Sequence, residues 1–476
     1  MKNMMSIKAL VLVIASVAVP GLANATTLLE IYQQALQSDP RIHEAEARRL
    51  ASLEAKPQAR GAYLPQIGFS GDATRTESSG NSVGQDASGN FGSFNSRSEA
   101  DTTRWQFDLR QTLFRWDQIV GLRRADKTVA KAEADREAAQ QDLIVRVVQT
   151  YFDVLAAEDQ LTAIHANRNA IARQLEQAKQ RFDVGLIAIT DVQESQAAYD
   201  SAVADEIGAK RLLATAREFM REITGEYVSK LSAPSPDLPL NTPDPASETD
   251  WIDLALSQNL ALVSSRIDEQ LARDEISFRR NGHYPSIDLV ANTGESDTSR
   301  DQSVNNAPFL NADSDGKSDS IGIQFNIPIF AGGATNSRVK ESIYLHRASR
   351  EVLQRVTRET ERQTRDAYLG VLSEISRVQA LARAVESNET ALEATQAGFD
   401  VGTRTIVDVL DAQFLLYQSI TQYYQSRYDY LLNAMRLRQA AGNLQVQDLE
   451  KLEQFMVERK TPEEQFADEA AAAASP

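Results

Sequence analysis

The chain has 476 residues and a formal net charge of −17 at pH 7, so nucleic acid is not an expected partner. It has no cysteine, which excludes a disulfide framework, and its four histidines (His43, His165, His283 and His346) lack the spacing of metal ligands. No Walker A loop, dinucleotide fingerprint or nucleophile elbow occurs, and we therefore expect no enzyme activity, no cofactor and no metal site.

The N-terminus has the pattern of a secretory signal peptide. Lys2 and Lys8 flank the start of an apolar stretch of about ten residues, which is too short to span a bilayer as a helix. Ala23-Asn24-Ala25 fits a cleavage site, so we expect residues 1–25 to be removed and the protein to be exported. No later segment approaches the ~18 apolar residues of a membrane helix, and a membrane role would therefore depend on β-strands.

The first half of the mature chain, residues 26–231, is predicted to run helix, strand, strand, helix, helix. Apolar periodicity predicts helices over residues 28–56, 117–180 and 188–224, and strands over residues 66–75 and 105–113. Residues 76–103 are rich in Ser, Gly, Asn and Asp, which predicts a long solvated loop. The long helix carries apolar residues at four-three spacing, which is typical of coiled coils.

The second half, residues 248–449, repeats this order. It is predicted to contain helices over residues 248–280, 334–397 and 406–439, and strands over residues 286–293 and 321–329, with a polar loop at 294–318. A proline-rich linker, residues 232–247, joins the halves. Residues 450–476 are acidic and then alanine-rich, which predicts a disordered tail.

Recurrent motifs indicate that the two halves are tandem structural repeats. Phe182-Asp183-Val184-Gly185 recurs as Phe399-Asp400-Val401-Gly402, an offset of 402 − 185 = 217. The offset is 285 − 65 = 220 at Pro65 and Pro285, so it changes little along the repeat. A fixed period of this kind predicts a duplicated architecture.

The predicted strands number four per chain, whereas about eight are needed to close a barrel. If these strands span a membrane, oligomerisation is required, and three copies would supply twelve. The aromatic residues near the strands leave two alternatives, an ordinary core or a lipid-facing band with interfacial aromatics. The export signal and the missing membrane helix favour the second. These residues are Trp105, Phe107, Phe114, Trp116, Phe325 and Phe330.

Three stretches carry a resemblance to a known family: Val184–Gln193, Asn281–Pro285 and Val401–Ala412. With them, residues 28–449 resemble the TolC family of outer-membrane efflux proteins, and the third stretch suggests a close relation to the protein after which that family is named. The resemblance implies a mainly α fold with a small β part. It implies a homotrimer with a long coiled-coil α-helical barrel in the periplasm and a transmembrane antiparallel β-barrel, four strands per chain, in outer-membrane lipid.

The same resemblance implies a function. It points to a channel-tunnel, a passive exit duct for multidrug efflux pumps and type I protein secretion, recruited by inner-membrane pumps and periplasmic adaptors. An alternative is a soluble periplasmic coiled-coil adaptor or structural protein, against which the strand pairs argue. A third class, an exported enzyme, has no supporting site in the sequence.

Asp408 and Asp411 are the first candidates for a periplasmic gate. At positions i and i+3 their carboxylates share one face of a helix, a pattern that usually marks a solvated surface. In a trimer they would form two stacked rings of three carboxylates, which the family resemblance places at the periplasmic constriction. Like charges held close together raise pKa values and attract cations.

Arg404 stands four residues before Asp408 and has two interpretations. It is either an exposed intrahelical partner, worth a few tenths of a kcal/mol, or a link that holds the entrance shut. Family similarity assigns the second role, with Thr190 and Asp191 as partners. Phe399 departs from the family pattern, in which tyrosine is common, so the closed state here should depend more on Arg404.

Gly185 and Gly402 also have two interpretations. Glycine suits the backbone of a tight helix turn, which is sufficient to explain both. The resemblance adds that these exposed turns contact the adaptor. One further pattern, Asn311 to Gly316, resembles the start of a calcium loop, but Gly322 occupies the position where a bidentate glutamate is needed, so a polar loop is the better interpretation.

Overall fold

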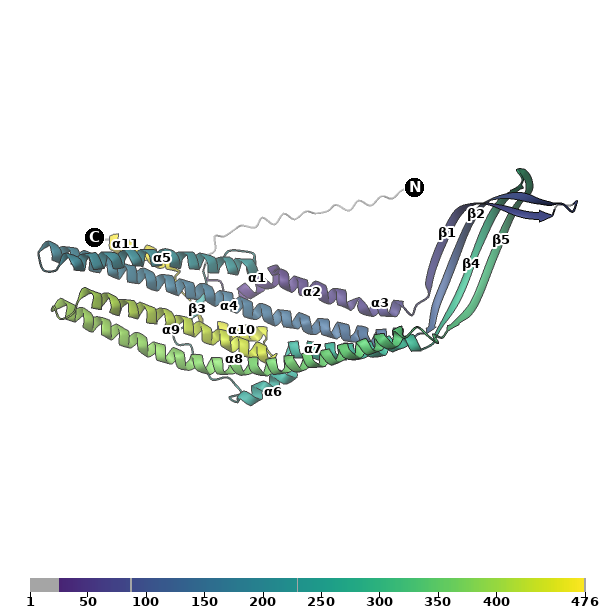
Figure 1. Ribbon diagram of the computed structural model, residues 1–476. Coiled ribbons are helices and arrows are strands. Elements are labelled where there is room, and N and C mark those ends of the chain that lie inside the picture. The colour runs from purple at the N-terminus through teal and green to yellow at the C-terminus, as the bar shows by residue number, and fades with distance from the viewer. Residues whose placement is uncertain (1–24, 86–87, 229, 475–476) are drawn as a thin grey trace, which may run out of the picture. The chain divides into compact units, whose positions relative to one another are not determined.

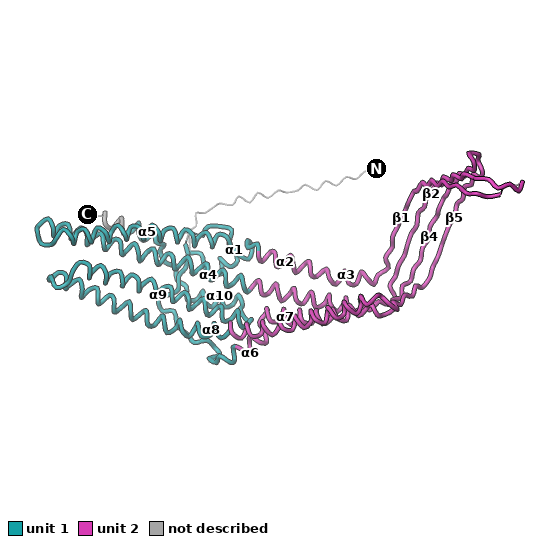
Figure 2. The backbone as a smooth tube through the Cα atoms, in the orientation of Figure 1, with its two compact units in different colours: residues 1–40, 141–251, 364–476 teal, residues 41–140, 252–363 magenta. Residues whose placement is uncertain are grey.

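The structure is a computed structural model that describes residues 25–85, 88–228 and 230–474 (Figure 1). The predicted signal peptide lies almost entirely outside the described residues. The chain divides into two compact units (Figure 2). Unit 1 comprises Met1–Pro40, Gln141–Trp251 and Thr364–Pro476, and unit 2 comprises Arg41–Gln140 and Ile252–Gln363.

The prediction of a mainly helical chain with a smaller strand part is confirmed. The helices are α1 (Leu28–Ser38), α2 (Pro40–Leu53), α3 (Ala55–Gly61), α4 (Trp116–Asp183), α5 (Ile189–Thr224), α6 (Glu248–Gln258), α7 (Leu260–Arg279), the 3-10 helix η1 (Arg280–His283), α8 (Ala334–Asp400), α9 (Ile406–Ala441), α10 (Val446–Glu453) and α11 (Pro462–Ala474). Among the described residues, none of the helices has the length and apolar character to cross a membrane.

The first helix of each repeat is divided, although one continuous helix was predicted in both. The division in the first repeat falls at Asp39, because Pro40 cannot donate a backbone hydrogen bond. In the second repeat the side chain of Asn259 accepts a 3.0 Å hydrogen bond from the Leu262 N–H and starts α7. Pro57 directly follows the helix predicted over residues 28–56, but it lies in the first turn of α3, where proline is tolerated.

Unit 2 contains one antiparallel sheet whose strand order is β1-β2-β4-β5. The strands are β1 (Gln66–Gln85), β2 (Phe91–Phe114), β4 (Ser286–Val304) and β5 (Ala307–Asn326). The prediction of long loops at 76–103 and 294–318 is therefore wrong. Those segments are polar on both faces, and their backbone groups are satisfied by pairing with neighbouring strands, so their composition reports solvent exposure and not the absence of a strand.

Unit 1 is built around α4, α5 and α9, and its core contains Tyr151, Leu155, Leu213 and Leu437. The tail that was predicted to be disordered is folded: β6 (Met456–Glu458) pairs with β3 (Ser232–Pro234), and α11 follows. The order comes from long-range contacts that the composition of the tail does not reveal.

Candidate functional site

Two tight turns connect the long helices of each repeat, α4 to α5 and α8 to α9. They lie at the same end of unit 1 (Figure 1). Gly185 and Gly402 occupy them with φ of +77° and +79°, the left-handed region that favours glycine. An added Cβ would meet nothing within 4 Å at either position, so the backbone conformation and not lack of space requires glycine.

The first turn is closed by backbone hydrogen bonds from Gly185 to Phe182 and from Leu186 to Arg181, both 2.9 Å, and it is supported by packing. Ile187 lies against the buried side chains of Leu175, Ala178 and Val192. The helix after it starts at Ile189 without a side-chain cap.

The second turn is fixed by hydrogen bonds. Thr405 and Asp408 form a capping box: the Thr405 hydroxyl accepts from the Asp408 N–H at 3.3 Å, and Asp408 Oδ2 accepts from the Thr405 N–H at 2.8 Å. The Thr405 N–H, and after it the Thr405 hydroxyl, which lies 2.9 Å from Asp408 Oδ2, hold the pKa of Asp408 below its usual range. Within one chain the pKa of Asp408 is thus lowered, whereas a ring of like charges is expected to raise it. Asp411 is exposed one turn further along α9.

Arg404 is largely exposed, and its ion pair with Asp408 is weak. Its Nη1 lies 4.0 Å from Asp408 Oδ1, the outer limit of an ion pair. Thr190 instead hydrogen-bonds Asp191, at 3.4 Å. In the described part of the chain no hydrogen bond or ion pair joins Arg404 to either residue.

The stem of Arg404 passes over Gly398. A Cβ at position 398 would lie 2.8 Å from Arg404 Cγ and 3.2 Å from Thr403 Oγ1. The carbonyl of Gly398 also accepts hydrogen bonds from the Thr403 N–H (2.8 Å) and the Arg404 N–H (3.3 Å). Gly398 therefore permits the close approach that positions Arg404.

Arg181 is a functional candidate that sequence reasoning missed. It belongs to the last turn of α4, and its Nη2 lies 2.9 Å from Oδ1 of Asp400, at the end of α8. Its guanidinium carbon lies 4.9 Å from the ring centroid of Phe399. This contact joins the C-terminal end of α4, in the first repeat, to the C-terminal end of α8, in the second. The sequence held one signal for it. Position 181 corresponds to position 398 (398 − 181 = 217), and the repeated motif is therefore preceded by arginine in one copy and by Gly398 in the other.

The sheet of unit 2 presents a second candidate surface. Paired residues of neighbouring strands share a face, and the register aligns Ile67, Leu109, Ala291 and Ile321 in one row. The apolar side chains of this face are largely exposed. They include Ile67, Phe69, Phe107, Ile321, Ile323 and Phe325.

The same face changes character over two rows. Thr293 and Asp319 share the row of Phe69 and Phe107, and the next row pairs Trp105, Glu295 and Lys317. The next rows toward the β4–β5 turn carry acidic side chains, namely Asp297, Asp315, Asp101, Asp313, Glu99 and Asp301. An apolar band bounded by an aromatic residue and then by charges is the pattern of a lipid-facing surface.

Comparison with known proteins assigns the family. A sequence model described as "Outer membrane efflux protein" matches residues 31–226 and 251–443. The chain belongs to the outer membrane efflux protein family. It is 37% identical over 425 residues to outer membrane protein TolC of Vibrio cholerae, which covers 89% of this chain and 92% of that protein.

Two further similarities agree with this assignment. The efflux protein chain is 29% identical over 442 residues to the alkaline protease secretion protein AprF of Pseudomonas aeruginosa, covering 92% and 89% of the two chains. Its fold is similar to the crystal structure of outer membrane protein VceC of Vibrio cholerae, with a TM-score of 0.68, 18% identity and coverage of 87% and 96%. The protein is therefore an outer-membrane channel that serves efflux, with a fold of two tandem repeats.

Proposed function

We propose that this outer membrane efflux protein works as a homotrimeric, passive exit duct without catalysis of its own. Each chain supplies four long antiparallel strands, too few to close a sheet on itself, and three copies would bring twelve. The apolar band of the sheet lies in outer-membrane lipid, and unit 1 lies in the periplasm.

The observation that carries the gate is the position of the two helix turns. Both occur at one end of unit 1, and the Arg181–Asp400 ion pair joins the helices that lead into them. Arg404, Asp408 and Asp411 follow directly on the second turn. Around a threefold axis this end forms the constriction, with Arg404 reaching Thr190 and Asp191 of a neighbouring copy.

The exposed turns also form the contact for partners. Val184, Leu186 and Val401 flank Gly185 and Gly402, and these residues are 71%, 73% and 75% exposed. Apolar side chains presented at an exposed tip are suited to a periplasmic adaptor that recruits an inner-membrane pump.

The cargo comprises small toxic molecules and secreted proteins. The family description supports efflux, and the similarity to AprF, named for alkaline protease secretion, supports type I secretion. No comparison supports the alternative of a soluble periplasmic adaptor, and the exposed apolar band argues against it.

The test combines assembly and conduction. Full-length protein should fractionate with the outer membrane, migrate as a heat-labile oligomer, and cross-link up to a trimer. Purified trimers should form channels in planar bilayers. Cross-linking that saturates at a dimer, or the absence of channels from intact trimers, would contradict the proposal.

A further inference from the structure

A C-terminal segment, residues 456–466, lies across unit 1, and we name it the C-terminal strap. Its strand β6 pairs with β3 in register Ala233 to Val457, and the Ser235 N–H donates to the Phe455 carbonyl at 2.8 Å. Lys230 Nζ lies 2.7 Å from Glu458 Oε1. The strap is therefore attached through its backbone to the linker between the repeats and through charge to Lys230, at the end of the first repeat.

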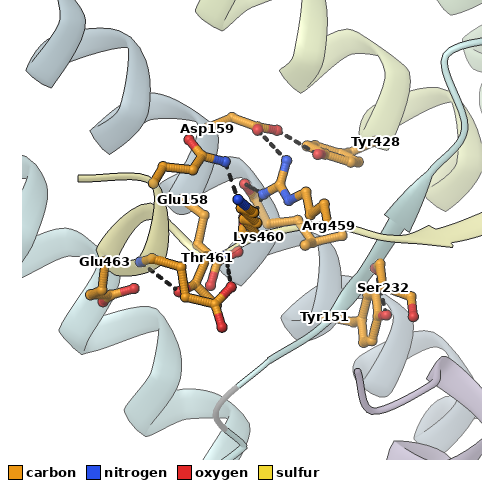
Figure 3. A network of polar contacts seen from close by, with 12 residues as sticks. Tyr151, Glu158, Asp159, Ser232, Tyr428, Arg459, Lys460, Thr461 and Glu463 are labelled. Carbon is orange, nitrogen blue, oxygen red and sulfur yellow. Dashed lines mark hydrogen bonds and ion pairs between the residues drawn. The ribbon is translucent and has the colours of Figure 1, made fainter. Parts of the chain in front are cut away.

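The strap inserts one arginine between two buried carboxylates of α4 (Figure 3). Glu158 and Asp159 are 2% and 9% exposed. Arg459 Nη2 lies 3.2 Å from Glu158 Oε2, and its Nη1 donates to Asp159 Oδ1. A single guanidinium thus neutralises two neighbouring charges, which its forked geometry permits.

Asp159 connects this charge cluster to α9. Its Oδ2 accepts a hydrogen bond from the hydroxyl of Tyr428, which is 3% exposed. Arg427, the preceding residue of α9, donates to the carbonyl of Ser235 beside the strap. Asp159 therefore joins α4 of the first repeat to α9 of the second, and the strap acts on this contact through Arg459.

A second arginine ties in α5. Arg217 donates from Nη2 to Glu158 Oε1 at 3.1 Å and from Nη1 to Glu463 Oε1, in the strap, at 2.9 Å. The Phe466 ring stacks on His165 with centroids 3.6 Å apart. The strap thus contacts α4 and α5, and reaches α9 through Asp159.

The electrostatics make Arg459 necessary for this arrangement. Burial raises the pKa of Glu158 and of Asp159, and Arg459 opposes that rise in both. Without it, Arg217 would be the remaining cation for Glu158, and Asp159 would lose its direct ion pair. A buried charge without its partner is strongly unfavourable, so the cluster would rearrange and the Tyr428 contact would be disturbed.

We propose that Arg459 is a positioning residue for the closed channel: through Asp159 and Tyr428 it holds α9 against α4, and with α9 the turn that carries Arg404 and Asp408. The inference rests on the proposed gate. Tyr428 and Asp408 are 20 residues apart on one uninterrupted helix, roughly 30 Å at 1.5 Å per residue. A shift of the helix at Tyr428 is therefore transmitted to the gate.

The test is single-channel recording of the full-length protein in planar bilayers. Arg459→Gln should raise the resting open fraction severalfold, and Arg459→Lys should raise it less, because it keeps the charge without the fork. Lys460→Gln is the matched control, since this neighbouring side chain is 66% exposed and forms its ion pair with Asp468 of α11 and not with α4, α5 or α9 in the described part of the chain. A closed Arg459→Gln channel would overturn the proposal.

Further variants separate positioning from loss of stability. Leu143→Ala removes a fully buried side chain of α4 away from the strap, and it should lower the melting temperature without opening the channel. If Arg459→Gln does not assemble, the triple variant Glu158→Gln, Asp159→Asn, Arg459→Gln removes the unpaired charges. It should assemble and remain closed, and an open triple variant overturns the charge mechanism.

Arg404→Ser distinguishes the failure of this inference from the failure of the gate. If Arg404→Ser opens the channel and Arg459→Gln does not, the gate stands and the strap has no positioning role. If Arg459→Gln opens the channel and Arg404→Ser does not, the strap controls the aperture without the proposed Arg404 link. If neither opens it, both ideas are wrong.

Discussion

The guanidinium of Arg181 and the carboxylate of Asp400 lie 2.9 Å apart and join the last turns of α4 and α8. The two residues occupy corresponding ends of different repeats and are 219 positions apart in sequence. The ring of Phe399 lies beside the same guanidinium. The two helix turns of one chain are thus held together by a contact that neither turn could make alone.

Arg181→Ala should loosen the resting gate. A partly exposed ion pair contributes about 0.5–1 kcal/mol, so three copies would change the closed-to-open ratio roughly ten- to hundredfold. Resting conductance in planar bilayers checks this. Arg181→Lys is the control, because it keeps the charge and loses the flat contact with Phe399, and it should have a smaller effect. Wild-type conductance in Arg181→Ala would remove this link from the gate.

Arg404→Ser should raise resting conductance and sensitise cells to large antibiotics. A charge-assisted contact of this exposure is worth at most about 1–3 kcal/mol, but three symmetric copies would bias the aperture. Phe399→Ala should open the gate less, because Phe399 has no hydroxyl and only supports Arg181. If Arg404→Ser conducts like the wild type, Arg404 is merely a surface partner of Asp408.

Gly398→Ala should resemble Arg404→Ser in conductance. The new methyl group would lie 2.8 Å from Arg404 Cγ, so the arginine must leave its present position. Gly370→Ala, on the same helix, is the matched control, since its methyl group would meet only ordinary contacts with Asn433 at 3.5 Å. Equal conductance of the two variants would show that the approach of Arg404 to Gly398 does not matter for closure.

Asp408 and Asp411 should bind a trivalent cation that is added from the periplasmic side, and the bound cation should block the channel. Replacing both by alanine should abolish the block, because the concentrated negative charge is lost. Block that persists in the double variant refutes the carboxylate rings.

The pH dependence of the block tests the state of Asp408. Thr405 lowers the pKa of Asp408. At pH values above the ordinary aspartate range the carboxylate is therefore charged, and its cap stabilises α9. As the pH falls through this lowered pKa, both the cap and the block should be lost. A midpoint above the ordinary range would instead show that repulsion within the ring outweighs the cap.

Alternate positions of β5 should differ in their contact with lipid. The chain has no cysteine, so single substitutions can be labelled selectively. A fluorophore at Ile321→Cys or Ile323→Cys should be quenched by lipids carrying quenchers in their acyl chains, whereas one at Gly322→Cys or Asp313→Cys should not. Uniform quenching along β5 would show that the apolar band is not the lipid-facing surface.

The regular features of this chain were predictable because they repeat. The glycine turns follow from Gly185 and Gly402, and the long helices between breakers follow from uninterrupted apolar periodicity. The polar halves of the strands were missed, because Ser, Asn and Asp resemble a loop when their pairing partners are not visible. Many of these partners lie across the β1–β2 and β4–β5 hairpin turns, and the β2–β4 pairing joins segments about 200 residues apart. A pattern along one segment reports neither set of hydrogen bonds.

The single residues that join distant segments were missed for the same reason. Arg459 is 300 positions from Asp159 and lies in a tail whose composition predicts disorder. Arg181 is an ordinary helix residue until Asp400 is placed beside it. Charges that act across the fold have no periodicity, so only the packed structure identifies their partners.

The divergence of the two repeats at position 181 and its counterpart 398 limits how the protein can be simplified. An arginine at one position reaches across to the other repeat, and a glycine at the other makes room for Arg404. In the proposed trimer, six identical half-chains would have either six such arginines and no room for Arg404, or six glycines and no bridge. The fused chain would therefore give the proposed pore an alternation that no ring of equal halves could reproduce.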